Sequence, residues 1–382
     1  MSQTREKKPS EQSAAVRWWE PVEPDPGIAA LRKRVLGADH PLVGMEFLFW
    51  LSGSGNPAGT GGCVVMEREG KVIGIGAVAS RLARIDGEDV KVAFAYDLMI
   101  DKKQTGANTG RYALRMAHHW IDIVNQRGYA IGVTFPNDNW RPLLLSRHLT
   151  WQPVFSPALV VRPLRQAAFL SPAAGGLKRR VIGLGFAVAG AAIDAVLVAK
   201  RAVSGKVRAK VRPLNLSDIH DGPAVQRLWE ARRDDTRATL SRDVATLRWR
   251  YEQHPFRRYE VLGLFQRDAL TAILVTTLRQ LEGVQSVVIV DAILPPDRIG
   301  DGVCLVQTAV RRAAQTGAQI AATEVLPGTT LGRVMRAAGF LTPPKRLAPK
   351  GFTLCIMPMQ TQSSSPLDSG NWTFAWGDID VV

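Results

Sequence analysis

The feature that most constrains the fold of this chain is an order of predicted elements that occurs twice. In the first half, apolar runs broken by Glu-Gly and Asp-Gly turns predict a hairpin over residues 61–87, and residues 88–100 predict a central strand. A polar loop leads into a predicted helix from about Gly110 to Gln126, which Gly128 ends. A strand, a short helix and a last strand follow, over residues 129–135, 136–149 and 153–164.

The second half repeats this order. A hairpin is predicted over residues 259–283, a central strand over 284–294 and a helix from about Gly302 to Gln315. A strand, a helix and a closing strand come after it, over residues 318–326, 329–340 and 351–359.

Single residues also correspond between the halves, Asp97 with Asp291 and Phe135-Pro136 with Leu326-Pro327. The repeat predicts an α/β fold of two tandem domains, each with a mixed sheet. We expect a disordered tail, a first domain, an apolar and basic-flanked linker helix and a second domain, over residues 1–17, 18–166, 167–210 and 211–382.

Charge and cysteine content limit which classes of partner the protein can bind and in which cellular compartment it is expected. A formal net charge of +15 favours anionic partners such as nucleic acid, acidic lipid headgroups or phosphorylated cofactors. No zinc finger, basic zipper or aromatic RNA-binding motif accompanies the basic residues, so we expect no nucleic acid. The three cysteines fit no metal or disulfide spacing, and the N-terminus lacks the apolar core of a signal peptide, which predicts a cytoplasmic protein without a metal.

The order hairpin, central strand, polar loop, helix, strand, helix and strand resembles the GCN5-related N-acetyltransferase (GNAT) fold, present twice. The motifs FPNDN at 135–139, TLRWRYEQHP at 246–255 and NWTFAWGDID at 371–380 are similar to a tandem-GNAT subgroup. This resemblance covers most of residues 20–380 and implies two GNAT-like domains, with acyl-CoA as a substrate and its site in the first domain.

The stretch DLMIDKKQTGANTGR, residues 97–111, holds the loop that the resemblance implies for coenzyme A. The family's loop reads Gln/Arg-x-x-Gly-x-Gly/Ala, and its backbone N–H groups hold the pyrophosphate at the start of a helix. The alternative is a polar loop that only connects a strand to a helix. The implied residues are Lys103, Gly106 and Asn108 in the motif's register, with Gln104, Thr109, Gly110 and Arg111 beside them.

The corresponding loop of the second half is PPDRIGDGVCLV. Asp297 and Asp301 lie where an anion would have to approach. We therefore interpret the second domain as the poorer coenzyme site, which contributes structure and part of the acceptor cleft.

Acyl transfer to an amine needs a thioester site, a base and an acid. Backbone donors for the thioester are expected at Leu98, Met99 and Ile100. Asp97 is the expected base, because an amine with a pKa of about 10 must lose a proton; the alternative is a strand-end Asp bonded to a neighbouring loop. The family's usual Tyr acid is absent, and Ser146 stands in its register.

Four further polar residues are candidates for acceptor binding, each with a structural alternative. Asn137 and Asn139 either line the acceptor pocket or cap the following helix. Tyr251 and His254 either reach the cleft or pack at the end of a helix.

The linker is the stretch that suggests a membrane. Residues 181–199 are apolar except for Asp194, and Lys and Arg flank them. As a helix they would be about 28 Å long. Three interpretations stay open: a transmembrane span, a helix buried between the domains, or a helix in the cytoplasmic membrane interface with its basic flanks on anionic headgroups.

Together these features predict an acyl-CoA-dependent N-acyltransferase, peripheral on an inner membrane of bacterial type, with an amine acceptor that is a lipid. Among tandem-GNAT enzymes the combination most resembles bacterial ceramide synthases, which join a long-chain acyl group to the amine of a sphingoid base. Two alternatives stay open: an N-acetyltransferase for an amino sugar of an exported polysaccharide, and a non-catalytic scaffold whose coenzyme loop has decayed.

Overall fold

The computed structural model describes residues 14–164, 209–281, 283–343, 351–361 and 363–379. Most of the expected tail and almost all of the linker helix predicted at 167–210 lie outside these residues, so both stay predictions. Of the helices within the described ranges, none is long and apolar enough to span a bilayer.

The chain divides into two compact units, which we describe separately. Unit 1 comprises Met1–Arg81, Val90–Pro153 and Cys355–Gln362, and unit 2 comprises Leu82–Asp89, Val154–Leu354 and Ser363–Val382.

Unit 1 is a mixed sheet with helices on both faces. Alternate residues of one strand face opposite layers: Val64 and Met66 pack with α4, whereas Cys63 and Val65 pack with α1 and α2. The strands follow in the spatial order β1-β2-β3-β4-β5-β14-β6. In chain order the elements are β1 (Ala15–Trp19), α1 (Pro26–Leu36), α2 (Glu46–Ser52), β2 (Gly62–Arg68), β3 (Lys71–Ile85), β4 (Glu88–Ile100), α3 (Lys102–Thr105), η1 (Gly106–Asn108), α4 (Thr109–Gln126), β5 (Ile131–Thr134), α5 (Arg141–Leu144), β6 (Gln152–Phe155) and β14 (Leu354–Pro358).

Unit 2 has the same layered construction. Val287 and Ile289 of its central strand pack with α9 and α10, whereas Val288 and Val290 pack with α7 and η3. The strands follow in the spatial order β7-β13-β12-β11-β10-β8. In chain order the elements are β7 (Ala158–Pro163), β8 (Lys210–Pro213), α7 (Asp221–Arg232), β9 (Ala238–Leu240), α8 (Val244–Leu247), η3 (Arg248–Glu252), β10 (Glu260–Gln266), β11 (Ala269–Leu281), β12 (Val284–Ile293), α9 (Ile299–Gln315), β13 (Ile320–Val325), α10 (Thr330–Ala337), η4 (Ser365–Leu367), η5 (Ser369–Asn371), β15 (Trp372–Thr373) and η6 (Trp376–Asp378).

The α/β fold class with two mixed sheets is thus confirmed, and the repeat extends to strand register. In each unit the central strand pairs in parallel with its neighbour over three residue pairs only. The first pairs are Val92 with Ile131 in unit 1 and Ser286 with Ile320 in unit 2.

This register confirms one predicted correspondence and corrects another. Asp97 and Asp291 both follow the first paired residue of their strand by five positions. Thr134 and Thr323 also correspond, since their hydroxyls donate to the carbonyls of Ala95 and Ile289 at 3.0 and 2.8 Å. The predicted correspondence of Phe135-Pro136 with Leu326-Pro327 is off by two residues, because β13 continues to Val325.

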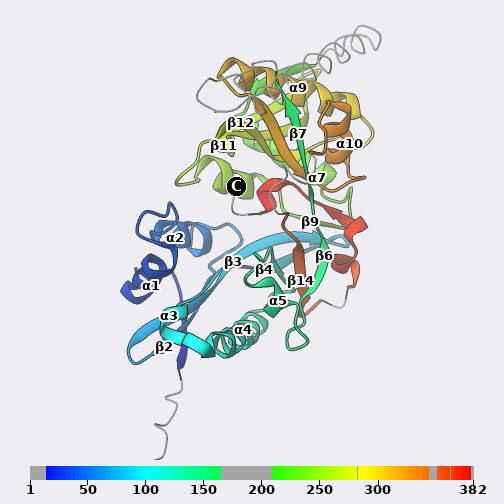
Figure 1. Cartoon of the computed structure of the whole chain (residues 1–382). Coiled ribbons are helices and arrows are strands. Elements are labelled where there is room, and N and C mark those ends of the chain that lie inside the picture. The colour runs from blue at the N-terminus through cyan, green and yellow to red at the C-terminus, as the bar shows by residue number, and fades with distance from the viewer. Residues whose placement is uncertain (1–13, 165–208, 282, 344–350, 362, 380–382) are drawn as a thin grey trace, which may run out of the picture. The chain divides into compact units, whose positions relative to one another are not determined.

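The last strand of each repeat lies in the other unit, which the sequence analysis did not foresee. β7, expected to close the first sheet, pairs with β13 of unit 2, and β14, expected to close the second sheet, pairs with β5 of unit 1. Figure 1 shows the green arrow of β7 among the yellow and orange elements of unit 2. Both strands are short and apolar, so each could form hydrogen bonds with the edge of either sheet. Their sequences alone do not determine which edge they pair with.

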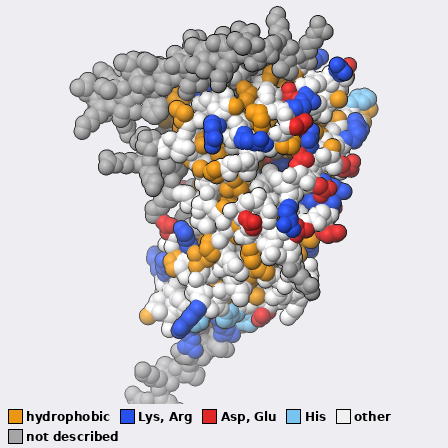
Figure 2. All heavy atoms as spheres, turned by 90° about the vertical axis from the view of Figure 1, so that its right-hand side faces the viewer, with side chains coloured by type: hydrophobic (Ala, Val, Ile, Leu, Met, Phe, Trp, Pro, Cys, Tyr) orange, Lys and Arg blue, Asp and Glu red, His pale blue; other side chains and the backbone are white. Residues whose placement is uncertain are grey.

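Ion pairs join many of the described arginines to acidic residues. On the face that Figure 2 shows, Lys and Arg side chains lie among Asp and Glu side chains. Arg17 contacts Asp25 at 2.5 Å and Glu67 at 2.7 Å, and Arg212 contacts Asp221 at 2.6 Å. Because the chain has 49 Lys and Arg residues and 34 Asp and Glu residues, many basic residues must lack an acidic partner of their own.

The strand exchange predicts that neither repeat folds alone. Residues 14–164 lack β14, so the edge of β5 is exposed and β7 has no partner. We expect this fragment to be insoluble or to lack a cooperative unfolding transition by circular dichroism, and co-expression with residues 209–382 to yield a soluble complex that co-purifies. A matched control fuses residues 351–361 to the fragment through a flexible linker. Cooperative unfolding of the unfused fragment would contradict the prediction.

Candidate functional site

The segment between β4 and α4, predicted as a loop, forms the short helices α3 and η1; it is largely exposed, and α4 follows it without a side-chain cap. Asn108 precedes α4 and makes no capping hydrogen bond with its side chain, and the first turn of α4 has no acidic residue. Gly106 has a φ of 52°, and a Cβ at Gly106 or Gly110 would meet no atom within 4 Å. The N–H groups of Gly106 and Thr109 donate within this segment, to the carbonyls of Lys102 and Gly106. An anion would therefore have to bind to other N–H groups around the two glycines, where there is open space.

Asp101 fixes the beginning of this loop. Its carboxylate accepts from the backbone N–H of Lys103 at 3.1 Å and of Gln104 at 3.4 Å, and Arg34 Nε donates to it at 2.8 Å. Burial acts to raise the pKa of Asp101, but these hydrogen bonds outweigh it and hold the pKa below the ordinary value. The loop therefore keeps its shape through a carboxylate that is ionised at neutral pH.

The edge of β4 beyond this pairing is the second feature of the site. The parallel pairing with β5 ends at Phe94 and Val133, whereas β4 continues to Ile100. The predicted thioester residues Leu98, Met99 and Ile100 therefore lie beyond the paired region and immediately before the loop. Backbone groups on such an edge can pair with an extended ligand as a further strand would.

Asp97 lies on this same stretch with an unusual backbone. Its φ of 47° places it in the left-handed region, which is uncommon for a residue with a side chain and is often found beside functional sites. Arg32 of α1 donates to its carboxylate, and the Asp97 side chain keeps 17% of its surface exposed while Arg32 keeps none. Burial raises the pKa of Asp97, and Arg32 opposes that rise.

The contact with Arg32 is the one expected if Asp97 has a structural role, as a strand-end Asp bonded to a neighbouring segment. It does not exclude that Asp97 also acts as a base. Arg32 also donates to the carbonyls of Leu42 and Val43, so it ties Asp97 to the loop after α1. A partly exposed carboxylate with a raised pKa, placed next to the open edge of β4, nevertheless has the chemistry to accept a proton.

The other predicted residues of unit 1 lie near the end of β5. Asn137 accepts from the backbone N–H of Asn139 at 3.1 Å and of Trp140 at 3.2 Å, so it caps the turn before α5 as the capping alternative expects. Asn139 is exposed. The hydroxyl oxygen of Ser146 is buried and has no hydrogen-bond partner among the described residues. Its role as an acid stays a prediction.

Unit 2 encloses the counterpart of Asp97 completely. Asp291 is 3% exposed, and its carboxylate accepts from Arg242 Nε at 2.6 Å and from the Tyr251 hydroxyl at 2.7 Å. Arg242 also donates to Asp378 at 2.8 Å. Burial raises the pKa of Tyr251, and the Asp291 charge adds to the rise. His254 is buried and packs on the Tyr259 ring at 5.6 Å, so both Tyr251 and His254 have the packing contacts that their alternative expects.

The helix start of unit 2 also differs from that of unit 1. Asp301 occupies the first turn of α9, is 4% exposed and accepts from Gln266 Nε2 at 2.8 Å. Gly302 lies tightly on α10, since a Cβ there would come within 2.7 Å of Val334. The Asp301 carboxylate also contacts Arg298 Nη2 at 2.5 Å, which offsets part of the repulsion that it would exert on a phosphate. The interpretation of the second domain as the poorer coenzyme site stays a prediction.

The sequence analysis missed the two arginines of α1 that hold this site. Arg32 and Arg34 lie more than sixty positions before Asp97 and Asp101, and no local pattern links them. One signal was present: Ile28, Leu31 and Arg32 share the buried face of α1, where an arginine requires an acidic or carbonyl partner.

No family model matches this chain, and no curated protein sequence does. Solved structures do match its fold. A GCN5-related N-acetyltransferase from Anabaena variabilis has a TM-score of 0.58 and 11% identity, over 90% of this chain and 73% of its own. A conserved Enterococcus faecalis protein of unknown function, named a probable N-acyltransferase, has a TM-score of 0.59 and 8% identity, over 91% and 73%.

Saccharomyces cerevisiae N-myristoyltransferase with bound myristoyl-CoA has a TM-score of 0.55 and 12% identity, over 89% of this chain and 82% of its own. At such low identity these similarities concern the fold. The resemblance to the GNAT fold is thereby confirmed over nearly the whole chain.

The Arg32–Asp97 pair predicts a specific stability pattern. Asp97→Asn leaves a fully buried guanidinium without its carboxylate, which should lower the free energy of unfolding by about 3–5 kcal/mol. Arg32→Met combined with Asp97→Asn should recover most of the loss in urea unfolding. Arg34→Met is the matched control, because Arg34 lies on the same helix with 39% of its side chain exposed and should cost about 1 kcal/mol or less.

The single variant Arg32→Met should make stability depend on pH. Without Arg32, burial alone acts on Asp97, and its pKa in the folded protein rises further above the unfolded value. A raised carboxyl pKa contributes stability at low pH that is lost as pH rises through the folded pKa. Unfolding midpoints measured from pH 4 to pH 8 should therefore fall relative to wild type; parallel curves would contradict a charged Asp97.

Proposed function

We propose that this protein is an acyl-CoA-dependent N-acyltransferase whose coenzyme site lies in unit 1. The observation that carries the proposal is the uncapped, open start of α4, which follows α3 and η1 after the stretch of β4 that extends beyond its pairing with β5. Unit 2 has the same strand register, but Asp301 and the enclosed Asp291 fill the corresponding positions.

The coenzyme would lie along these two features. Its pyrophosphate would accept from the backbone around Gly106, Asn108 and Gly110, with Lys103, Gln104, Thr109 and Arg111 beside it. Its extended arm would pair with the edge of β4 at Leu98–Ile100, which places the thioester near Asp97.

The reaction then needs one proton transfer at each end. The amine nitrogen attacks the thioester carbon, the C–N bond forms, the C–S bond breaks, and the amine proton passes to Asp97. The departing thiolate takes a proton from the Ser146 hydroxyl or from water. Burial of Asp97 favours this role, because a higher carboxyl pKa makes it a better proton acceptor.

The donor and acceptor are proposed to be lipidic. A similar fold in yeast binds myristoyl-CoA, which supports a long-chain donor here. The apolar residues 181–199 with basic flanks support an acceptor drawn from an anionic membrane surface on the cytoplasmic side. Our proposal is a sphingoid base as acceptor and a (dihydro)ceramide as product, with Asn137 and Asn139 of unit 1 as candidate acceptor contacts.

Substrate identity is tested by release of free coenzyme A thiol from purified protein. Acetyl-CoA and palmitoyl-CoA are each offered with a sphingoid base or an amino sugar. We expect turnover only with palmitoyl-CoA and the sphingoid base. Turnover only with acetyl-CoA and the amino sugar would contradict the lipid proposal and support the amino-sugar alternative. No turnover with any pair would favour the non-catalytic scaffold.

Two matched glycines test which unit holds the coenzyme. Gly110 and Gly300 are each the second residue of their helix, and a Cβ at either would meet no atom within 4 Å. Gly110→Leu should therefore fold normally, and helix propensity should add about 0.5–1 kcal/mol of stability. Its side chain would occupy the space of the pyrophosphate.

We expect Gly110→Leu to weaken coenzyme A binding in calorimetry by about tenfold or more, because several charge-assisted hydrogen bonds are lost. Gly300→Leu should leave the affinity unchanged. The opposite ranking would move the coenzyme site to unit 2.

A further inference from the structure

Arg68, the last residue of β2, contacts the segment that leads into α4. Its Nη2 donates to the Gln104 carbonyl at 2.7 Å, and it also donates to the Tyr112 hydroxyl, which raises the pKa of Arg68. The carboxylate of the exposed Glu69 lies 4.0 Å from its Nε. A guanidinium has five N–H donors in a planar fork, so the bonds to Gln104 and Tyr112 leave donors for a further group. Arg68 therefore brings a positive charge to the side of the α4 start.

The second unit supplies an internal comparison for Arg68. Arg68 pairs with Lys71 across its hairpin as Gln266 pairs with Ala269. In both hairpins a bulge lies between the third-last and the second-last residue of the first strand. Gln266 is therefore the counterpart of Arg68 in unit 2.

The residues that these two side chains contact also correspond. Tyr112 and Asp301 each precede the first paired residue of the following strand, Ile131 and Ile320, by nineteen positions. The buried faces of the two helices agree with this count, because every buried residue of α4 has a buried counterpart in α9. The contact of Arg68 with Tyr112 in unit 1 thus takes the place of a contact between Gln266 and Asp301 in unit 2.

In unit 2 this position binds a negative group. Gln266 Nε2 donates to the Asp301 carboxylate at 2.8 Å, and Arg298 Nη2 contacts the same carboxylate at 2.5 Å. The carboxylate is buried in the first turn of α9. In unit 1 a cation stands in place of Gln266, and a tyrosine stands in place of the carboxylate. Unit 1 therefore has the donor of this arrangement without its internal anion.

The direction of the strands places Arg68 beyond the end of β4, away from Asp97. The backbone N–H of Asp101, which follows β4, donates to the Ile73 carbonyl of β3 at 2.8 Å. β3 begins two residues before Ile73, at Lys71, and Lys71 pairs with Arg68. A coenzyme with its thioester at Asp97 and its pyrophosphate at the α4 start therefore extends its nucleotide end toward Arg68.

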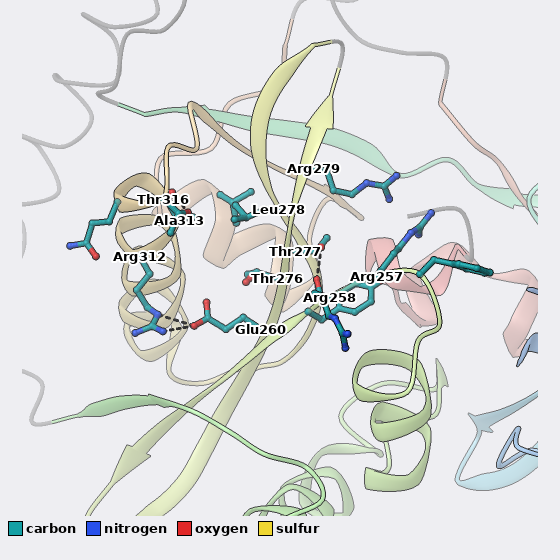
Figure 3. A pocket seen from close by; sticks show the side chains of 14 residues that line it. Arg257, Arg258, Glu260, Thr276, Thr277, Leu278, Arg279, Arg312, Ala313 and Thr316 are labelled. Atoms are coloured by element: carbon teal, nitrogen blue, oxygen red, sulfur yellow. Dashed lines mark hydrogen bonds and ion pairs between the residues drawn. The ribbon is translucent and has the colours of Figure 1, made fainter. Parts of the chain in front are cut away.

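The large hollow of unit 2 has several arginines, but its charges do not converge in this way. Its volume is about 780 Å³, and β10, β11, α9 and the segment before β10 line it. In Figure 3, Arg258 and Arg279 point away from each other. Arg312 donates to Glu260 at 2.9 and 2.5 Å. The hairpin end of unit 1 is therefore the better candidate for binding a phosphate.

We infer that Arg68 binds the 3′-phosphate of coenzyme A, an inference that rests on the proposed function. A guanidinium matches phosphate oxygens with paired, charge-assisted hydrogen bonds. The 3′-phosphate belongs to the nucleotide end of the coenzyme, which is the end that extends toward Arg68. The phosphopantetheine arm of an acyl carrier protein has no such phosphate. Arg68 therefore selects free acyl-CoA as the acyl donor.

Calorimetry of the full chain with coenzyme A and with 3′-dephospho-coenzyme A tests this inference. We expect wild type to bind coenzyme A about tenfold more tightly than the dephospho form, through charge-assisted hydrogen bonds to the 3′-phosphate. Arg68→Gln, which introduces the residue type of position 266, should bind both ligands with the affinity of wild type for the dephospho form. Arg68→Lys keeps the charge and should keep part of the preference.

The comparison of the two ligands separates phosphate binding from a purely structural role. If Arg68 only holds the segment through the Gln104 carbonyl, Arg68→Gln weakens the binding of both ligands by the same factor. Arg311→Gln is the matched control, because it removes one positive charge from an exposed position on α9. Its preference for coenzyme A should equal that of wild type.

Three results would overturn the inference. Equal affinity of wild type for both ligands would overturn it and leave the coenzyme site in place. A preference that Arg68→Gln retains, or that Arg311→Gln loses as well, would mean that other groups bind the 3′-phosphate or that the attraction is non-specific. Binding of neither ligand to wild type would overturn the proposed function together with this inference.

Discussion

The early end of the parallel pairing on the central strand is the constraint on which the rest of each unit depends. A strand that continues past its neighbour leaves backbone groups without sheet partners, and such groups need another partner or water. Thr134 and Thr323 satisfy the first carbonyl beyond the pairing in their units. The exchanged strands β14 and β7 then pair with the other edge of β5 and β13, so the shortened neighbours stay part of a continuous sheet. The opening on the central strand is therefore built into the sheet and does not depend on a loop conformation.

Duplication of this opening allowed its two copies to diverge. The backbone register is the same, whereas the side chains that meet it are different. In unit 2, Arg242 and Tyr251 satisfy both oxygens of Asp291, and the carboxylate of Asp301 occupies the helix start. Such a saturated buried network stabilises one arrangement of the chain, and a substrate would have to break it. In unit 1 the first turn of α4 has no acidic residue, and Asp97 contacts Arg32 and keeps part of its surface exposed. Unit 1 therefore has fewer hydrogen bonds around its aspartate, and its carboxylate is the one that a substrate could reach.

The sequence predicted the elements that depend on local pattern and on the repeat. It did not predict contacts between segments that are distant in the chain. Turn residues and apolar periodicity predicted the hairpins, the central strands and the helices, and the repeat placed Asp97 opposite Asp291. The exchange of β7 and β14 was not predictable from pattern, because the two strands are interchangeable in length and apolarity. Arg32 was missed for a related reason: helical periodicity shows that it is buried, but not which carboxylate it meets. The Asn137 cap was foreseen, since side chain and backbone there are neighbours in sequence.

The contact of Arg32 with Asp97 explains how one residue can have a structural and a chemical role. Burial without Arg32 would favour the protonated carboxyl, which cannot accept a proton from an amine. An exposed Asp would stay ionised but would be a weak base. Arg32 opposes the effect of burial without cancelling it. The pKa of Asp97 therefore stays above the ordinary value, but it rises less than burial alone would raise it. The bond to α1 also fixes the direction of the side chain on a backbone with a φ of 47°, where few residues are stable unaided. The same pair that anchors α1 to the central strand thus sets the basicity of the group nearest the open edge.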